Sequence, residues 1–113
     1  MSHDLNAIIK LIRDFHGIPE SVSIEANTKL EKELGITGDD GVELIEFLQD
    51  KMKLSFIGTD GTLSEAFDLN KNECLFNGEG FSLNFFSKKE KVKEIQVKDI
   101  LLAVQRVNKN NGN

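Results

Sequence analysis

The sequence has few of the residues that disulfides, metal sites and nucleic-acid surfaces need. Its single cysteine, Cys74, cannot form an internal disulfide and has no second cysteine or nearby histidine with which to bind zinc. Basic residues are outnumbered, with 14 Lys and Arg against 19 Asp and Glu and a net charge of −5. Because nucleic-acid binding requires clustered positive charge, we expect a basic protein partner and no nucleic acid.

Long uncharged apolar runs are also absent from the sequence. Near the N-terminus, Lys10, Arg13 and Asp14 interrupt the hydrophobic residues, so this stretch fits neither a signal peptide nor a membrane span. We therefore expect a cytoplasmic monomer that makes no membrane contact. The 113 residues, of which 39% are hydrophobic and 29% charged, fit one globular domain with a real core.

Residues for enzyme chemistry are scarce. His3 and His16 are the only histidines, and neither stands at the spacing of a nucleophile, a general base or a metal ligand. The adjacent carboxylates of Asp39 and Asp40 are better explained as first-turn charges of a helix than as an acid–base pair. We therefore predict a protein that is not an enzyme and that uses no cofactor and no metal.

Residues 68–79 form a second candidate for metal binding, because they place oxygen ligands at several positions of a calcium-binding loop. The position that requires glycine for the sharp turn is, however, Glu73. The flanks also differ from those of a calcium site, since residues 81–86 alternate like a strand and residues 58–62 are poor helix formers. A polar loop is the better interpretation, and calcium binding is the distant alternative.

Apolar periodicity predicts three main helices. The first covers residues 4–16 and is stopped by Gly17. The second begins near Thr37, which we expect to cap it in a box-like arrangement. The third covers residues 97–107, and residues 108–113 should be a disordered tail.

An arm of 34 residues, numbered 54–87, separates the second helix from the last, and its pattern is broken by Gly, Asn, Asp and Ser. Residues 63–67 are predicted as a short helix. Asn77-Gly78 lies between residues 74–76 and the alternating run 81–85, which predicts a small β-hairpin.

These elements predict a mainly α helical bundle of three main helices and a short one. It forms a single domain over residues 1–107, with the arm as an insertion and residues 88–93 as a solvated, mostly basic connector. The predicted contact between the second and last helices contains four buried residues. They are Ile45, Leu48, Ile100 and Val104.

Acidic residues of the second predicted helix form a candidate partner-binding face. At about 100° per residue most of them fall on a narrow arc opposite the apolar one. The candidates are Asp39, Asp40, Glu43, Glu46 and Asp50. Same-sign neighbours three or four residues apart cost roughly a few tenths of a kcal/mol each. Two interpretations stay open, a solvated helix surface or a docking face for a basic partner.

Two short stretches of the sequence follow a known pattern. Residues 28–36, Thr-Lys-Leu-Glu-Lys-Glu-Leu-Gly-Ile, lead into Val42-Glu43-Leu44 and resemble the sequence that the acyl carrier protein family has around its acidic second helix. Residues 97–101, Val-Lys-Asp-Ile-Leu, are similar to the start of their final helix. The resemblance implies a carrier-like bundle whose second helix docks on basic patches of partner proteins.

The sequence departs from this family at the site of modification. Counted back from Val42-Glu43-Leu44, the carriers' Asp-Ser-Leu motif falls on Thr37-Gly38-Asp39, so Gly38 stands where the carriers have the serine that holds phosphopantetheine. This departure is similar to a group of uncharacterised small bacterial carrier-like proteins without the modified serine. The resemblance implies an interaction module without phosphopantetheine, and the alternative is a genuine carrier whose attachment site is in a different register.

Overall fold

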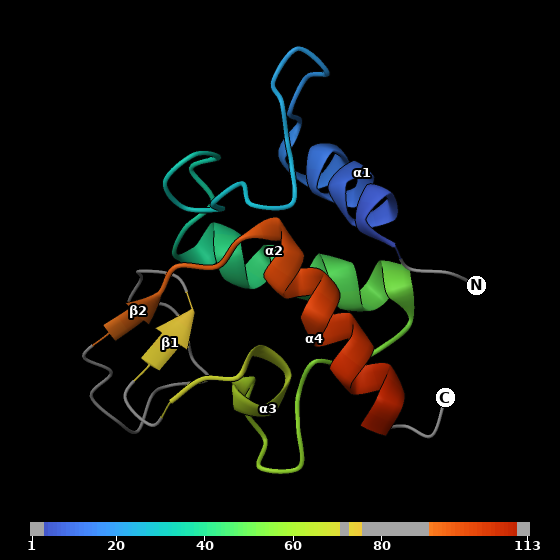
Figure 1. Cartoon of the computed structure of the whole chain (residues 1–113), viewed down its shortest axis with the longest axis vertical. Helices are drawn as coiled ribbons and strands as arrows, with labels where there is room; N and C mark the ends of the chain where they lie inside the picture. Colours follow the sequence, from blue (N-terminus) through green and yellow to red (C-terminus); the bar gives the residue numbers. More distant parts are fainter. Residues whose placement is uncertain (1–3, 71–72, 76–90, 111–113) are drawn as a thin grey trace.

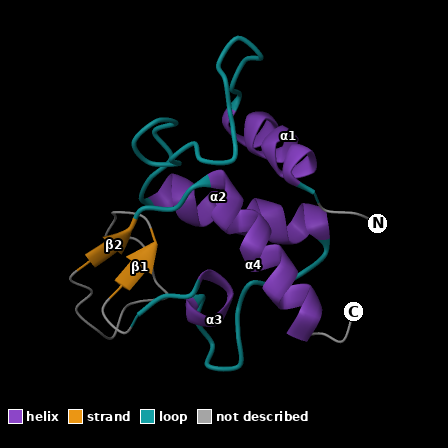
Figure 2. Ribbon diagram, in the orientation of Figure 1, coloured by secondary structure: helices purple, strands orange, loops and turns teal. Residues whose placement is uncertain are grey.

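The computed structural model describes residues 4–70, 73–75 and 91–110 (Figure 1). Over these ranges the protein is mainly α, as predicted, with four helices and two very short strands (Figure 2). In chain order they are α1 (Leu5–His16), α2 (Asp39–Met52), α3 (Ser64–Phe67), β1 (Glu73–Leu75), β2 (Lys91–Lys93) and α4 (Val97–Asn110).

The ends of α1 follow from local chemistry. Asp4 is the N-cap, and its carboxylate accepts a 2.9 Å hydrogen bond from the backbone N–H of Ala7. Gly17 adopts the left-handed conformation, with φ 65°, and its N–H bonds to the carbonyl of Arg13. The predicted helix over residues 4–16 is therefore confirmed.

One side of α2 is buried in the core, as its apolar arc predicts. Leu44 and Leu48 are completely buried, and Val42 and Phe47 at the margins of the arc are half-buried. The helix ends at Met52, and its C-cap, Lys53, adopts a left-handed conformation with φ 58°.

The four residues predicted to be buried between the second and last helices are all part of one hydrophobic core. They are Ile45, Leu48, Ile100 and Val104. The most extensive backbone contacts between helices are those of α1 with α2, α1 with α4 and α3 with α4. The predicted contact between α2 and α4 is not among these, so the four residues meet within a core that all the helices share.

The final helix, α4, is longer than predicted. Its start is capped by Asp99, whose carboxylate accepts a 2.8 Å hydrogen bond from the N–H of Gln96. The helix continues to Asn110, so the prediction of a disordered tail is wrong for residues 108–110. Residues 108–110 include no glycine or proline that would stop the helix, and Lys109 interacts favourably with the dipole in the last turn.

The arm contains the predicted short helix, which is α3. The turn and the second strand of the predicted hairpin lie outside the described residues. Its first strand overlaps β1, which pairs in parallel with β2. Lys91–Lys93 is therefore a strand and not a connector, and residues 88–90 of the predicted connector lie outside the described residues. The Lys93 ammonium donates to the carbonyls of Phe67 and Asp68, at 2.8 and 3.3 Å, which holds this end of the strand against α3.

Residues 26–30 join the N-terminal half of the chain to the start of α4 through backbone hydrogen bonds. Lys29 and Gln96 form an antiparallel bridge. On either side of it, Leu30 N–H donates to the Ile95 carbonyl at 3.0 Å and Lys98 N–H donates to the Ala26 carbonyl at 2.8 Å. This tie places the completely buried Leu30 in the core.

Candidate functional site

The predicted site residues lie together on one surface of α2, which we call the acidic face. It consists of Asp39, Asp40, Glu43, Glu46 and Asp50, and all five side chains are exposed. Since the opposite side of the helix is buried, the helical repeat turns these carboxylates toward solvent. Their predicted exposure is confirmed.

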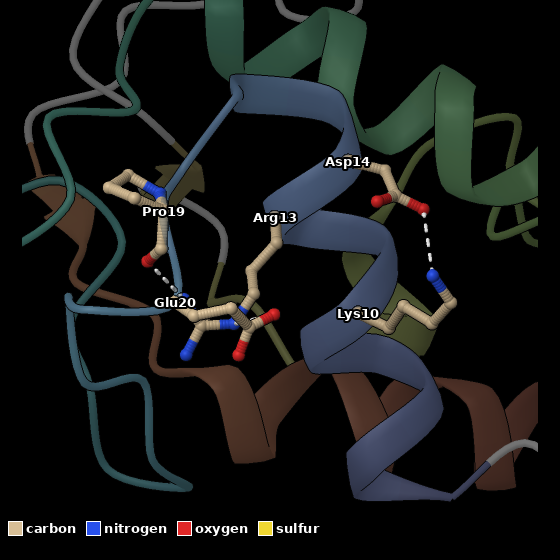
Figure 3. A network of polar contacts seen from close by, with 5 residues as sticks. All are labelled: Lys10, Arg13, Asp14, Pro19 and Glu20. Atoms are coloured by element: carbon tan, nitrogen blue, oxygen red, sulfur yellow. Dashed lines mark hydrogen bonds and ion pairs between the residues drawn. The ribbon is translucent and has the colours of Figure 1, made fainter.

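The carboxylates of the acidic face form no ion pair with any lysine or arginine of the described ranges. The ion pairs found within the described ranges involve α1. Lys10 lies 3.6 Å from Asp14, and Arg13 lies 4.0 Å from Glu20 (Figure 3). Lys51, in the last turn of α2, lies instead over the ring of Phe47, 5.5 Å from its centroid. Within the described ranges, no lysine or arginine therefore neutralises the acidic face by direct pairing.

An aromatic contact borders the acidic face. The rings of Phe47 and Phe15 are tilted against each other with centroids 5.3 Å apart, which joins α2 to α1. Phe47 follows Glu43 by one helical turn and is half-buried. A partner bound to the carboxylates would also reach the edge of this apolar contact.

The start of α2 differs from the prediction. Its N-cap is Gly38, with φ 57° and ψ −130°, and no side chain caps the helix. Thr37 lies one residue too early for that role, and its hydroxyl donates to the carboxylate of Glu31. The predicted cap at Thr37 is therefore wrong. The carbonyl of Gly38 begins the helical hydrogen bonds by accepting from the N–H groups of Gly41 and Val42.

The backbone of Gly38 explains why glycine suits this position. Its combination of φ and ψ lies in a region that glycine enters freely and that side chains with a Cβ avoid. A serine at this position, where the carrier resemblance places the modified residue, would be strained. The neighbouring hydroxyl of Thr37 is already hydrogen-bonded to Glu31.

A groove of 440 Å³, which no pattern in the sequence predicts, lies beside α3. Its walls include Glu65, whose carboxylate accepts hydrogen bonds from the hydroxyl and the N–H of Thr59 at 2.8 and 3.3 Å. Gly58 permits this contact, because a Cβ there would lie 2.5 Å from the Glu65 carboxylate. Nearby, hydrogen bonds from the N–H and hydroxyl of Thr62 lower the pKa of Asp60. These polar groups hold the loop in place.

The part of the chain that the structure describes brings together no three His, Cys, Asp or Glu residues able to hold a metal ion. The candidate calcium segment, residues 68–79, is described only at 68–70 and 73–75. Among the described helices, none is both long and apolar enough to cross a membrane.

Comparison of the chain with protein-family models, curated proteins and solved structures gave no match. The resemblance to acyl carriers therefore remains a prediction from short motifs.

Proposed function

We propose that the protein is a non-enzymatic, acyl-carrier-like interaction module that binds a basic protein partner through the acidic face and carries no phosphopantetheine. One observation carries this proposal. Five exposed carboxylates occur on one helix without an ion pair to any described lysine or arginine.

The energetics of α2 support a role in association. Repulsion between like charges one turn apart opposes helix formation and offsets the favourable interaction of Asp39 and Asp40 with the helix dipole, so the acidic face contributes little net stability to the fold. The helix is held instead by its buried residues, such as Leu44 and Leu48. Such a surface accelerates encounter with a positively charged partner and suppresses encounter with a negatively charged one.

The alternative is a genuine acyl or phosphopantetheine carrier with its attachment residue elsewhere than Gly38. The strained backbone that a serine would adopt at position 38, and the hydrogen bond between Thr37 and Glu31, weigh against attachment at the start of α2. Incubation with a promiscuous phosphopantetheinyl transferase and coenzyme A distinguishes the two. We expect an unchanged intact mass, whereas a stoichiometric adduct would establish the carrier function.

The docking proposal is tested by reversing charge on the acidic face. The double variant Glu43→Lys with Glu46→Lys should keep its helical circular dichroism, because both side chains are exposed. It should lose the partners that wild type captures from cell lysate at low salt. With a purified partner, the association rate should fall more than the dissociation rate rises, because rim charges act mainly on encounter.

A matched control separates the acidic face from net charge. The double variant Glu20→Lys with Glu25→Lys changes the net charge by the same amount at two exposed positions outside α2. It should retain most of the capture, and capture by wild type should weaken as salt is raised. Equal capture by the α2 variant and wild type would reduce the acidic face to a solvated helix surface.

A further inference from the structure

A pocket of 350 Å³ lies along one side of α1, where the chain after the helix folds back over it. The helix contributes Asn6, Ile9, Lys10 and Arg13, and the following segment contributes Glu20 and Ile24. Asn6, Ile9 and Arg13 line the pocket together because they stand three and four residues apart. The volume is at the small end of the range for ligand sites, about 300–1,000 Å³.

The central polar group of this pocket is the guanidinium of Arg13. Its side chain is only 14% exposed, and its Nη1 donates a 2.7 Å hydrogen bond to the carbonyl of Pro19 (Figure 3). This bond orients the guanidinium, which carries further N–H donors. No other hydrogen bond of Arg13 to the described residues is formed, and Arg13 is one of the residues that line the pocket.

The ionic partner of Arg13 within the described part, Glu20, is held loosely. Its carboxylate lies 4.0 Å from Nε, the outer limit of an ion pair, and its side chain is 93% exposed. Such a pair gains little, because solvent screens the attraction and the glutamate loses side-chain entropy. Glu20 thus shows that a carboxylate can approach Arg13. Because Glu20 is bound weakly, another carboxylate can take its place.

We propose that this pocket binds a small monocarboxylate. The carboxylate of the ligand replaces that of Glu20 at Arg13 and forms the two parallel hydrogen bonds that a guanidinium favours. Its aliphatic chain lies against Ile9, which is half-buried, and Ile24, which is 7% exposed. The contact to Pro19 already holds the guanidinium in place, so little further ordering is needed on binding.

The other charged side chains of the pocket favour a ligand with one negative charge over a ligand with two. Lys10 pairs with Asp14, 3.6 Å away, and Figure 3 shows this pair on the other side of the α1 ribbon from the Arg13 guanidinium. A second negative charge on the ligand would therefore gain no free cation and would be repelled by the displaced Glu20 carboxylate. Inorganic phosphate should therefore bind more weakly than a monocarboxylate.

Titration of isotope-labelled protein followed by NMR tests the site, with hexanoate as the probe. We expect a Kd of about 1 mM, which is what a ligand of this size can supply, and shifts in the amide signals of Asn6, Arg13 and Ile24. Hexanamide, which has the same shape without the charge, should bind at least about tenfold more weakly. Equal binding of hexanoate and hexanamide, or no binding of hexanoate, would overturn the proposal.

The variant Glu20→Gln gives the sharpest readout, because it removes the competing carboxylate from an exposed position. It should tighten hexanoate binding by about two- to fivefold. Glu25→Gln is the matched control, since it makes the same charge change in the same segment outside the pocket lining, and it should leave the Kd unchanged. Equal Kd values for the two variants would contradict displacement of Glu20.

Arg13→Lys keeps the charge but loses the paired donors, and it should weaken hexanoate binding by roughly tenfold. Unchanged hexanoate affinity in this variant would exclude Arg13 as the carboxylate-binding group. If Arg13→Lys does not fold, the comparison of Glu20→Gln with Glu25→Gln still decides the proposal.

Discussion

The packed helices α1 and α2 both contribute apolar side chains to the core, and they use their charged residues differently. On α1, Asp4 caps the helix, Lys10 pairs with Asp14, and Arg13 binds the segment that follows. On α2, no side chain caps the start, and the acidic face has no ion-pair partner in the described ranges. Charge on α1 therefore supports local geometry, whereas charge on α2 can change with little loss to the fold.

The largest expected effects test the similarity of the two helices in the core. Ile12 on α1 and Leu48 on α2 are both completely buried. Ile12→Ala and Leu48→Ala should each lower the free energy of unfolding by about 2–5 kcal/mol, because each leaves a cavity. Urea denaturation measures both, and an unchanged midpoint for either variant would show that its helix does not belong to the shared core.

Glycine substitutions sharpen the contrast between the end of α1 and the start of α2. Gly38→Ser should lower the free energy of unfolding by about 1–3 kcal/mol, since serine would adopt a backbone conformation that disfavours a Cβ. Gly17→Ala, in the left-handed region with open space around it, should cost roughly 1 kcal/mol. Thermal denaturation compares the two, and a more stable Gly38→Ser protein would mean that α2 begins with a different backbone conformation.

Loss of the α1 cap should have a smaller effect. Asp4→Ala removes the hydrogen bond to Ala7 and should cost about 1 kcal/mol. Asp39→Ala on α2 removes only a favourable interaction with the helix dipole, worth about 0.3–1 kcal/mol, and relieves repulsion by Glu43. The urea midpoint should fall further for Asp4→Ala than for Asp39→Ala. A larger fall for Asp39→Ala would contradict the assignment of Asp4 as a cap.

Charge reversal should have the smallest effect and should differ in sign between the helices. Asp14→Lys replaces the attraction to Lys10 by repulsion and should lower stability by roughly a few tenths of a kcal/mol. Glu46→Lys should raise stability by a similar amount, because it relieves repulsion within the acidic face. Melting temperatures at low salt measure the difference, which should shrink at high salt. A destabilised Glu46→Lys protein would reveal a stabilising role for that carboxylate.

Much of the architecture follows from local patterns in the sequence. The apolar arc of α2 predicted its buried side, and Gly17 predicted the end of α1, because both signals depend on neighbouring residues alone. The start of α2 was misplaced because the hydroxyl of Thr37 binds Glu31, six residues earlier, in place of the helix N-terminus. The periodicity of apolar residues does not predict which of two hydrogen-bond partners a hydroxyl will bind.

The pocket at Arg13 could not be predicted for a related reason. In the sequence, Asn6, Ile9 and Arg13 look like part of the mixed surface of an ordinary helix. They line a pocket only because the chain after Gly17 folds back, which brings the Pro19 carbonyl to Arg13 and Ile24 to Ile9. The two β-strands likewise depend on contacts between distant parts of the chain, since Glu73–Leu75 pairs with Lys91–Lys93.

The backbone tie between residues 26–30 and the start of α4 has a consequence for folding kinetics. Formation of the Lys29–Gln96 bridge closes a loop that contains α2 and α3, and the entropy of closure must be lost before the bridge contributes any enthalpy. Folding should accordingly be slower than in bundles whose contacts are mostly local. During synthesis, a nascent chain that ends before Ile95 lacks the native acceptor for the N–H of Leu30, so the core can close only after that segment has emerged from the ribosome.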